Sequence, residues 1–142
     1  MDEKIQERLI AHEGISHYAY TDSIGFITVG IGRCLDPRRG QGLSTDECLY
    51  LLGNDIKRIT AELSKYHWFT IQDPVRQGVL IELAFNIGIA GLCTFKKMIK
   101  ALEEKDYNEA YLELMDSQWV HQVGKERSQD IGYRLKMGSY CA

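Results

Sequence analysis

Two carboxylates and a hydroxyl group lie close together near the start of the 142-residue sequence, at Glu13, Asp22 and Thr28. Two carboxyl groups in different environments suit the hydrolysis of a glycosidic bond. One donates a proton to the leaving oxygen, and the other stays ionised beside a water molecule or the developing positive charge. Each residue type taken alone is also common as a surface charge, a turn former or a strand residue. The combination favours a carbohydrate-cleaving site.

The element that must position Glu13 is a short helix. Residues 3–12 have a helical pattern, Asp2 is a candidate N-cap, and Gly14 can end the helix. Glu13 therefore lies at the C-terminal edge of this helix, where the helix dipole opposes the ionised form of a carboxyl group. This placement predicts that Glu13 is the acid of the pair.

The element that must position Asp22 and Thr28 is a β-hairpin. Residues 18–31 alternate in the manner of two strands, and the turn at residues 21–25 presents Asp22. Side chains alternate between the two faces of a strand, so the aliphatic residues of the second strand share one face and Thr28 lies on the other. We expect the aliphatic face to be buried and Thr28 to point away from the hairpin's core. The aliphatic residues are Ile27, Val29 and Ile31.

Glycines follow Thr28 on the same face of the predicted strand. Gly30 is one of them, and Gly32 is another if the strand continues that far. A glycine in a strand has no side chain to block an approaching molecule. The glycines therefore predict that the space beside Thr28 is open to a ligand.

The rest of the chain is predicted to be helical. Ser44 and Glu47 form a capping box before a helix of about twenty residues. Asp73 and Pro74 begin the next helix as N-cap and first residue, and Gly88 ends it. The fold class is therefore α+β, mostly α-helical. Further helices are expected at residues 94–104, 106–117 and 125–136.

Composition narrows the classes of function. A net charge of −3 and a pI near 5.8 give no broad basic surface for nucleic acid. The sequence contains no run of about 18 apolar residues, so we expect no membrane span. The first ten residues lack the apolar region of a secretory signal, so we expect synthesis in the cytoplasm. The cysteines are spaced too widely for a zinc site or a CxxC redox motif. We expect their thiols to be reduced. If the protein works in an oxidising compartment, the first candidate disulfide is between Cys34 and Cys48.

The hairpin region resembles the signature of the phage-type lysozymes, glycoside hydrolase family 24. The likeness continues in the same order through most of the chain. This resemblance implies a bilobed lysozyme fold in one domain, 1–142, with a small lobe at about 15–45 and a helical lobe at about 65–142 plus the N-terminal helix. The matching residues are Glu13-Gly14, Tyr18, Tyr20, Asp22, Gly25, Thr28-Val29-Gly30-Ile31-Gly32, Ala84-Phe85-Asn86-Ile87-Gly88, Gly91, Phe95, Asp106 to Ala110, Gln118-Trp119 and Arg127.

The resemblance also implies an activity. It is that of an N-acetylmuramidase, which cleaves the β-1,4 bond between N-acetylmuramic acid and N-acetylglucosamine in peptidoglycan with inversion. Glu13 would be the general acid, Asp22 the carboxylate that positions or activates water, and Thr28 its helper. No cofactor is expected, because the chain supplies both acid and base. Inversion requires a carboxyl separation of about 6.5–9.5 Å, which leaves room for the water molecule.

The resemblance suggests substrate contacts beyond the two carboxylates. Gly30, Phe85 and Asn86 match positions that line the cleft, and Arg127 matches an arginine that faces the catalytic glutamate. Phe85 is equally typical of core packing, and Arg127 is also typical of a solvated helix charge. Both alternatives stay open from the sequence alone.

Charged residues near the hairpin depart from the family pattern. Many relatives have histidine where this chain has Arg33, and we predict that Arg33 pairs with Asp55 on the long helix. Arg38-Arg39 and a lysine cluster could engage anionic wall polymers, although a solvated surface is the more common explanation for such clusters. The cluster comprises Lys96, Lys97 and Lys100.

The biological role that follows from the resemblance is bacterial lysis. We expect a monomeric, bacteriolytic endolysin with antimicrobial action, made in the host cytoplasm and acting on peptidoglycan in the periplasm. A holin or a phage particle would deliver it. The alternative is a catalytically silent lysozyme-like protein that binds peptidoglycan or serves a structural purpose, and the presence of Glu13, Asp22 and Thr28 argues against it.

Overall fold

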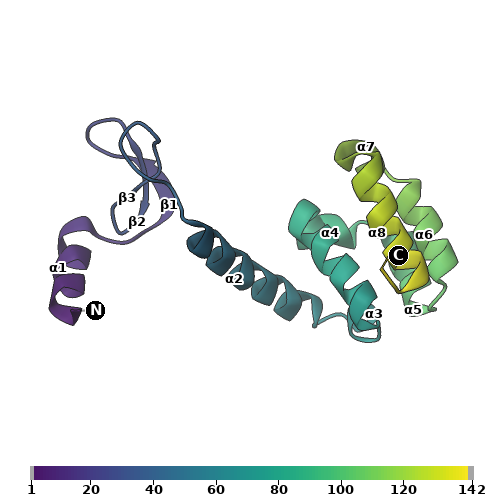
Figure 1. The fold of residues 1–142 in the computed structure, drawn as a ribbon. Helices are drawn as coiled ribbons and strands as arrows, with labels where there is room; N and C mark the ends of the chain where they lie inside the picture. Colours follow the sequence, from purple (N-terminus) through teal and green to yellow (C-terminus); the bar gives the residue numbers. More distant parts are fainter. Residues whose placement is uncertain (1, 141–142) are drawn as a thin grey trace. The chain divides into compact units, whose positions relative to one another are not determined.

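The computed structural model describes residues 2–140, which form three strands and eight helices in two compact units that divide between Leu51 and Leu52 (Figure 1). The expected α+β, mostly helical fold class is confirmed. The boundary between the units falls within α2, and the expectation of one domain stays a prediction. The first unit contains α1 (Glu3–Glu13), β1 (Ser16–Thr21), β2 (Ile27–Gly30), β3 (Arg33–Cys34) and the start of α2 (Thr45–Leu63). The second contains the end of α2, α3 (His67–Thr70), α4 (Pro74–Cys93), α5 (Lys96–Glu103), α6 (Tyr107–Met115), α7 (Trp119–Val123) and α8 (Lys125–Met137).

The N-terminal helix begins and ends where its capping residues predict. The Asp2 side chain accepts a hydrogen bond from the Lys4 backbone N–H at 2.9 Å. Gly14 ends α1 with a φ of 73°, a conformation that glycine adopts without steric cost. Glu13 is therefore the last residue of the helix, as predicted.

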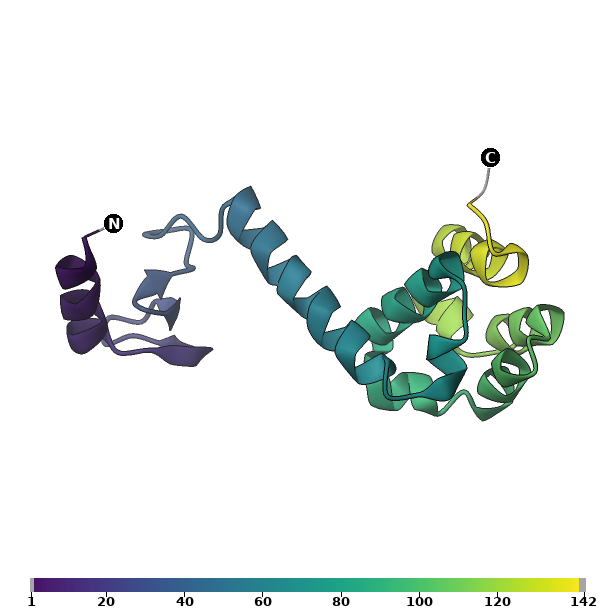
Figure 2. The same ribbon diagram turned by 90° about the horizontal axis from the view of Figure 1, so that it is seen from below.

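The strands form one antiparallel sheet in the order β1-β2-β3, next to α1 within the same unit (Figure 2). The predicted hairpin is confirmed as β1 and β2, with Tyr20 opposite Thr28. The expectation that β2 continues beyond Gly30 is wrong, because the chain turns there and returns as β3. Gly30 and Gly32 both have a φ of 69°, which favours glycine and makes this second turn possible.

The buried face of β2 is the opposite of the one predicted from alternation. Ile27 and Ile31 are 51% and 43% exposed, whereas Thr28 is only 4% exposed. Thr28 lies on the central strand, and its hydroxyl donates to the Phe26 carbonyl at 3.1 Å, so its polar group is satisfied although the side chain is buried. The period of a strand tells which residues share a face, but not which face is covered.

The start of α2 is held by the predicted capping box. The Glu47 backbone N–H donates to the Ser44 hydroxyl at 3.1 Å, and the Ser44 backbone N–H donates to the Glu47 carboxylate at 3.0 Å. These reciprocal bonds satisfy backbone donors that have no partner within the helix.

Arg33 forms an ion pair with Glu47, and the predicted pairing with Asp55 is wrong. Its Nη1 lies 2.6 Å from a Glu47 carboxylate oxygen and also donates to the Gly42 carbonyl at 3.0 Å. Asp55 pairs with Arg58 on its own helix. Glu47 stands in the first turn of α2, close to β3, whereas Asp55 lies about 12 Å further along the helix at its rise per residue.

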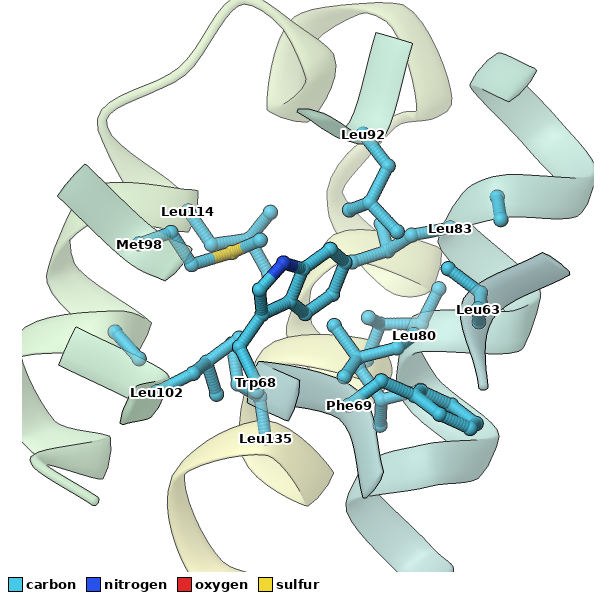
Figure 3. Packing of buried hydrophobic residues seen from close by; sticks show 14 of the residues in the cluster. Leu63, Trp68, Phe69, Leu80, Leu83, Leu92, Met98, Leu102, Leu114 and Leu135 are labelled. Atoms are coloured by element: carbon cyan, nitrogen blue, oxygen red, sulfur yellow. The ribbon is translucent and has the colours of Figure 1, made fainter. Parts of the chain in front are cut away.

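The hydrophobic core of the described residues lies in the second unit (Figure 3). Trp68 and Phe69, on the short helix α3, are 6% and 2% exposed among leucines from the neighbouring helices. The sequence analysis missed α3 and α7, since helices of four and five residues are too short to show a period. The fully buried leucines of the cluster are Leu63, Leu80, Leu83, Leu92, Leu102, Leu114 and Leu135.

The long helix α4 crosses this core and bends at Gly88. Asp73 caps it by accepting from the Arg76 backbone N–H at 3.0 Å, and Pro74 is its first residue, both as predicted. Gly88 has non-helical angles (φ 81°, ψ 161°), so it ends the first helical segment before a shorter one follows. Within residues 2–140, α4 alone is long and apolar enough to cross a membrane, and its central residues Val79 and Leu83 are buried in the core.

The ion pair between Arg33 and Glu47 predicts a pH-dependent stability. The hydrogen bond from Arg33, followed by those from Ser44, lowers the pKa of Glu47 from 4.5 to about 2. A carboxylate with a lowered pKa in the folded state stabilises the protein above its unfolded pKa, and this contribution is lost as the pH falls from about 4.5 to about 2. We expect Glu47→Gln to lower the Tm at pH 7. Near pH 2 the variant and the unsubstituted protein should have the same Tm, as measured by circular dichroism.

Asp46→Asn, at the neighbouring position, is the control. It also removes a negative charge from the first turn of α2, but Asp46 forms no ion pair with the described residues. A Tm difference for Glu47→Gln that is as large at pH 2 as at pH 7 would contradict this origin of the stability.

Candidate active site

The Glu13 side chain lies directly against Gly32. A Cβ atom built on Gly32 would lie 2.8 Å from Glu13 Oε2 and 3.0 Å from its Cδ. The turn after β2 thus leaves room for the carboxyl group only because residue 32 has no side chain. The prediction that Gly32 is open to a ligand is wrong, because the Glu13 carboxyl group occupies that space.

Gly30 is different from Gly32 in its surroundings, although both have a φ of 69°. A Cβ atom on Gly30 would meet no other atom within 4 Å. The space next to Gly30 is therefore open in this structure, and its use by a substrate stays a prediction.

Asp22 is fixed by the turn between β1 and β2. One carboxylate oxygen, Oδ1, accepts from the backbone N–H groups of Ile24 at 3.0 Å and Phe26 at 2.8 Å. The Asp22 N–H donates to the Phe26 carbonyl at 2.9 Å. Within residues 2–140 no group donates to the second oxygen, Oδ2. That oxygen can accept a hydrogen bond from water.

Phe26 connects Asp22 to Thr28. Its carbonyl accepts from both the Asp22 N–H and the Thr28 hydroxyl, and its N–H donates to the Asp22 carboxylate. The Thr28 hydroxyl uses its proton in this contact, so its oxygen can still accept. The sequence analysis did not identify Phe26 as part of this arrangement, because the contacts involve only its backbone.

The loop that follows β3 borders the same turn. A pocket of about 470 Å³ is lined by Gly32, Arg33 and residues of the 40–47 segment. Within residues 2–140 no group of three or more His, Cys, Asp or Glu side chains could hold a metal ion. Cys34, Cys48 and Cys93 are not bridged, and Cys141 lies outside the described residues.

The other predicted site residues belong to the second unit. Phe85, on α4, is 50% exposed, which excludes the alternative that it is a core residue. Asn86 accepts a hydrogen bond from the buried Trp119 indole N–H at 3.0 Å, so it has a structural contact that the sequence did not suggest. Arg127, on α8, is exposed and forms no ion pair with the described residues. Its predicted contact with Glu13 stays a prediction.

Comparison with known proteins places this arrangement in a family. The sequence profile of the phage lysozymes matches residues 10–134, which include every predicted site residue. "Probable T4-type lysozyme 1" of Dictyostelium discoideum is 26% identical over 158 aligned positions, covering 92% of this chain and 93% of the relative. "Probable T4-type lysozyme 2" of the same organism is 36% identical over 59 residues, covering 42% of this chain and 35% of that relative. The chain therefore belongs to the phage lysozyme family and is a glycoside hydrolase of the muramidase type that degrades peptidoglycan.

Proposed function

We propose that this lysozyme cleaves the β-1,4 bond between N-acetylmuramic acid and N-acetylglucosamine with inversion, using Glu13 as general acid and Asp22 as the carboxylate that activates water. The observation that carries the proposal is the contact between the Glu13 carboxyl group and Gly32, at the turn that ends the strand of Thr28. It joins the end of α1 to the sheet that also holds Asp22.

Glu13 suits the acid's role because it is exposed and held at the end of a helix. In the proposed step its proton passes to the glycosidic oxygen as the bond to the anomeric carbon breaks. The N-acetylglucosamine portion then leaves as an alcohol.

Asp22 suits the base's role because its two oxygens have different tasks. Oδ1 is held by two backbone N–H groups, while Oδ2 receives no donor from the described residues and is left to bind water. In the proposed step Oδ2 accepts the proton of the attacking water as the water oxygen bonds to the anomeric carbon. Thr28 helps through the Phe26 carbonyl that it shares with Asp22, and its hydroxyl oxygen can accept from the same water. Inversion further requires a carboxyl separation of about 6.5–9.5 Å.

Gly30, Phe85, Asn86 and Arg127 are proposed to contact the glycan. The open space at Gly30 and the exposure of Phe85 support this for those two residues. The family membership supports a role in host-cell lysis by a phage or prophage, with access to the periplasm through a holin or a phage particle. On this proposal the enzyme is a monomeric, antimicrobial endolysin.

Glu13→Gln tests the proposal directly. The amide cannot donate a proton as a carboxylic acid does, so we expect muropeptide release from purified sacculi to fall by at least about 100-fold, within the range of acid catalysis. Chromatography of the released fragments measures the turnover, and the Tm should change little because Glu13 is exposed.

Glu7→Gln, on the same helix, is the matched control and should keep full activity. Binding to sacculi with no muropeptide release by the unsubstituted protein would contradict the proposed function. Release of products that initially carry the β-anomeric configuration, detected by proton nuclear magnetic resonance, would contradict inversion.

Gly32→Ala and Gly30→Ala form a second, paired test. Both glycines have the same φ, so alanine should cost a similar amount of stability at each, roughly 1–2 kcal/mol. Only at Gly32 does the new methyl group meet the Glu13 carboxyl group. We expect Gly32→Ala to lower kcat by about 10- to 100-fold through displacement of the acid, whereas Gly30→Ala should mainly raise KM.

Thermal unfolding and steady-state rates on solubilised sacculi measure both effects. Equal kcat values for the two variants would show that the contact between Glu13 and Gly32 does not position the acid.

Phe85→Ala and Asn86→Ala separate binding from stability in the second unit. Asn86→Ala leaves the buried Trp119 indole N–H without its partner, so we expect a loss of about 1–3 kcal/mol in the free energy of unfolding. Phe85→Ala should change stability by less than about 0.5 kcal/mol, because its side chain is half exposed, but should raise KM. Urea denaturation together with rates on solubilised sacculi measures this. An unchanged KM for Phe85→Ala would remove Phe85 from the proposed substrate contacts.

A further inference from the structure

Two arginines lie on the ring of the residue that holds the active-site turn together. The guanidinium carbons of Arg38 and Arg39 lie 5.0 Å and 5.5 Å from the centre of the Phe26 ring. Both distances are within the range of cation–π attraction. The backbone of Phe26 binds Asp22 and Thr28, so the two arginines lie on the side chain of a residue that contacts the proposed base.

The charge of Arg38 is already matched. Its Nε and Nη2 donate to the two carboxylate oxygens of Asp36 at 2.9 Å and 2.6 Å. The hydrogen bond from Arg38 lowers the pKa of Asp36 to about 2, so both groups stay ionised at neutral pH. Arg38 and Asp36 therefore form a nearly neutral pair.

The charge of Arg39 is not matched by any carboxylate of the described residues. Its side chain is exposed. Its backbone is fixed by a turn in which two N–H groups donate to the Asp36 carbonyl. The Arg39 N–H does so at 3.1 Å and the Gly40 N–H at 2.7 Å. The turn and the Phe26 ring thus hold an unpaired guanidinium group in place without neutralising it.

We propose that Arg39, supported by Phe26, binds a carboxylate of the peptide stem that the muramic acid next to the scissile bond carries. This rests on the proposed function, because it takes Asp22 to lie at the bond that is cleaved. Each such bond has a muramic acid on one side, so a peptide stem always projects near the site. Arginine suits the partner, since its planar guanidinium group can bind both oxygens of a carboxylate. Arg39 is thereby a specificity-determining residue for peptide-bearing glycan.

Arg39→Gln tests the proposal on three substrates: solubilised native sacculi, the same material with its carboxyl groups converted to neutral methylamides, and glycan strands stripped of peptide by an amidase. On native material we expect KM to rise about two- to five-fold with kcat unchanged, the range of an exposed ion pair. The rise should shrink as salt is added. On the methylamide and on the stripped strands, Arg39→Gln and the unsubstituted enzyme should have equal KM values.

Arg8→Gln is the matched control, because Arg8 is an exposed arginine of the same unit that also has no ion pair among the described residues. It should leave KM unchanged on all three substrates. Phe26→Leu removes the ring but keeps the backbone contacts, and should reproduce part of the effect of Arg39→Gln.

Several outcomes would overturn the proposal. An equal effect of Arg39→Gln on native and methylamidated material would show that no carboxylate is bound. An effect of Arg39→Gln on stripped strands as large as that on native material would show that Arg39 does not bind a carboxylate of the peptide stem, and an equal effect of Arg8→Gln would reduce it to overall charge. If the unsubstituted protein releases no fragments from any of the three substrates, the proposed function itself fails.

Discussion

The contact between the Glu13 carboxyl group and Gly32 is the constraint on which the active site depends. The carboxyl group can lie against the turn after β2 only because residue 32 lacks a Cβ atom, which would come within 2.8 Å of Oε2. The same glycine provides the positive φ that turns the chain from β2 into β3. The glycine therefore serves both the path of the backbone and the placement of Glu13, the proposed acid. The end of α1 at Gly14 completes the arrangement, since it makes Glu13 the last residue of the helix, just before the chain turns toward β1.

The second half of the site depends on a single peptide group. The carbonyl and the N–H of Phe26 bind Asp22 and Thr28, so one residue connects the proposed base to its proposed helper. Because these contacts use the backbone, they place no demand on the type of residue 26. The ring is free to contact Arg38 and Arg39, and it thereby connects the turn of Asp22 to the loop that carries the two arginines.

The helical unit is stabilised in a different way from the sheet. Most of its leucines and its two tryptophans are buried, and the Trp119 indole N–H among them has a specific partner in Asn86. In residues 2–51, by contrast, the only buried side chain is Thr28. The first unit therefore relies more on backbone geometry, capping and ion pairs such as that of Arg33 with Glu47. The carboxylate of Asp22, the proposed base, is correspondingly held by backbone N–H groups.

Local features of the sequence were enough to predict the helices with strong caps and the hairpin of Asp22. The caps at Asp2, Ser44, Asp73 and Asp106 involve residues only two or three positions apart, so no distant part of the chain can change them. The family was also predicted from the sequence, through the pattern of Glu13, Asp22 and Thr28, and the match of the phage lysozyme profile to residues 10–134 confirms the family.

Only the tertiary structure decided which face of β2 is covered, which carboxylate Arg33 meets, and what fills the space at Gly32. Each of these depends on residues that are brought together from different elements, and alternation or spacing carries no information on such contacts. The sequence alone therefore could not predict the burial of Thr28, the partner of Arg33 or the position of the Glu13 carboxyl group.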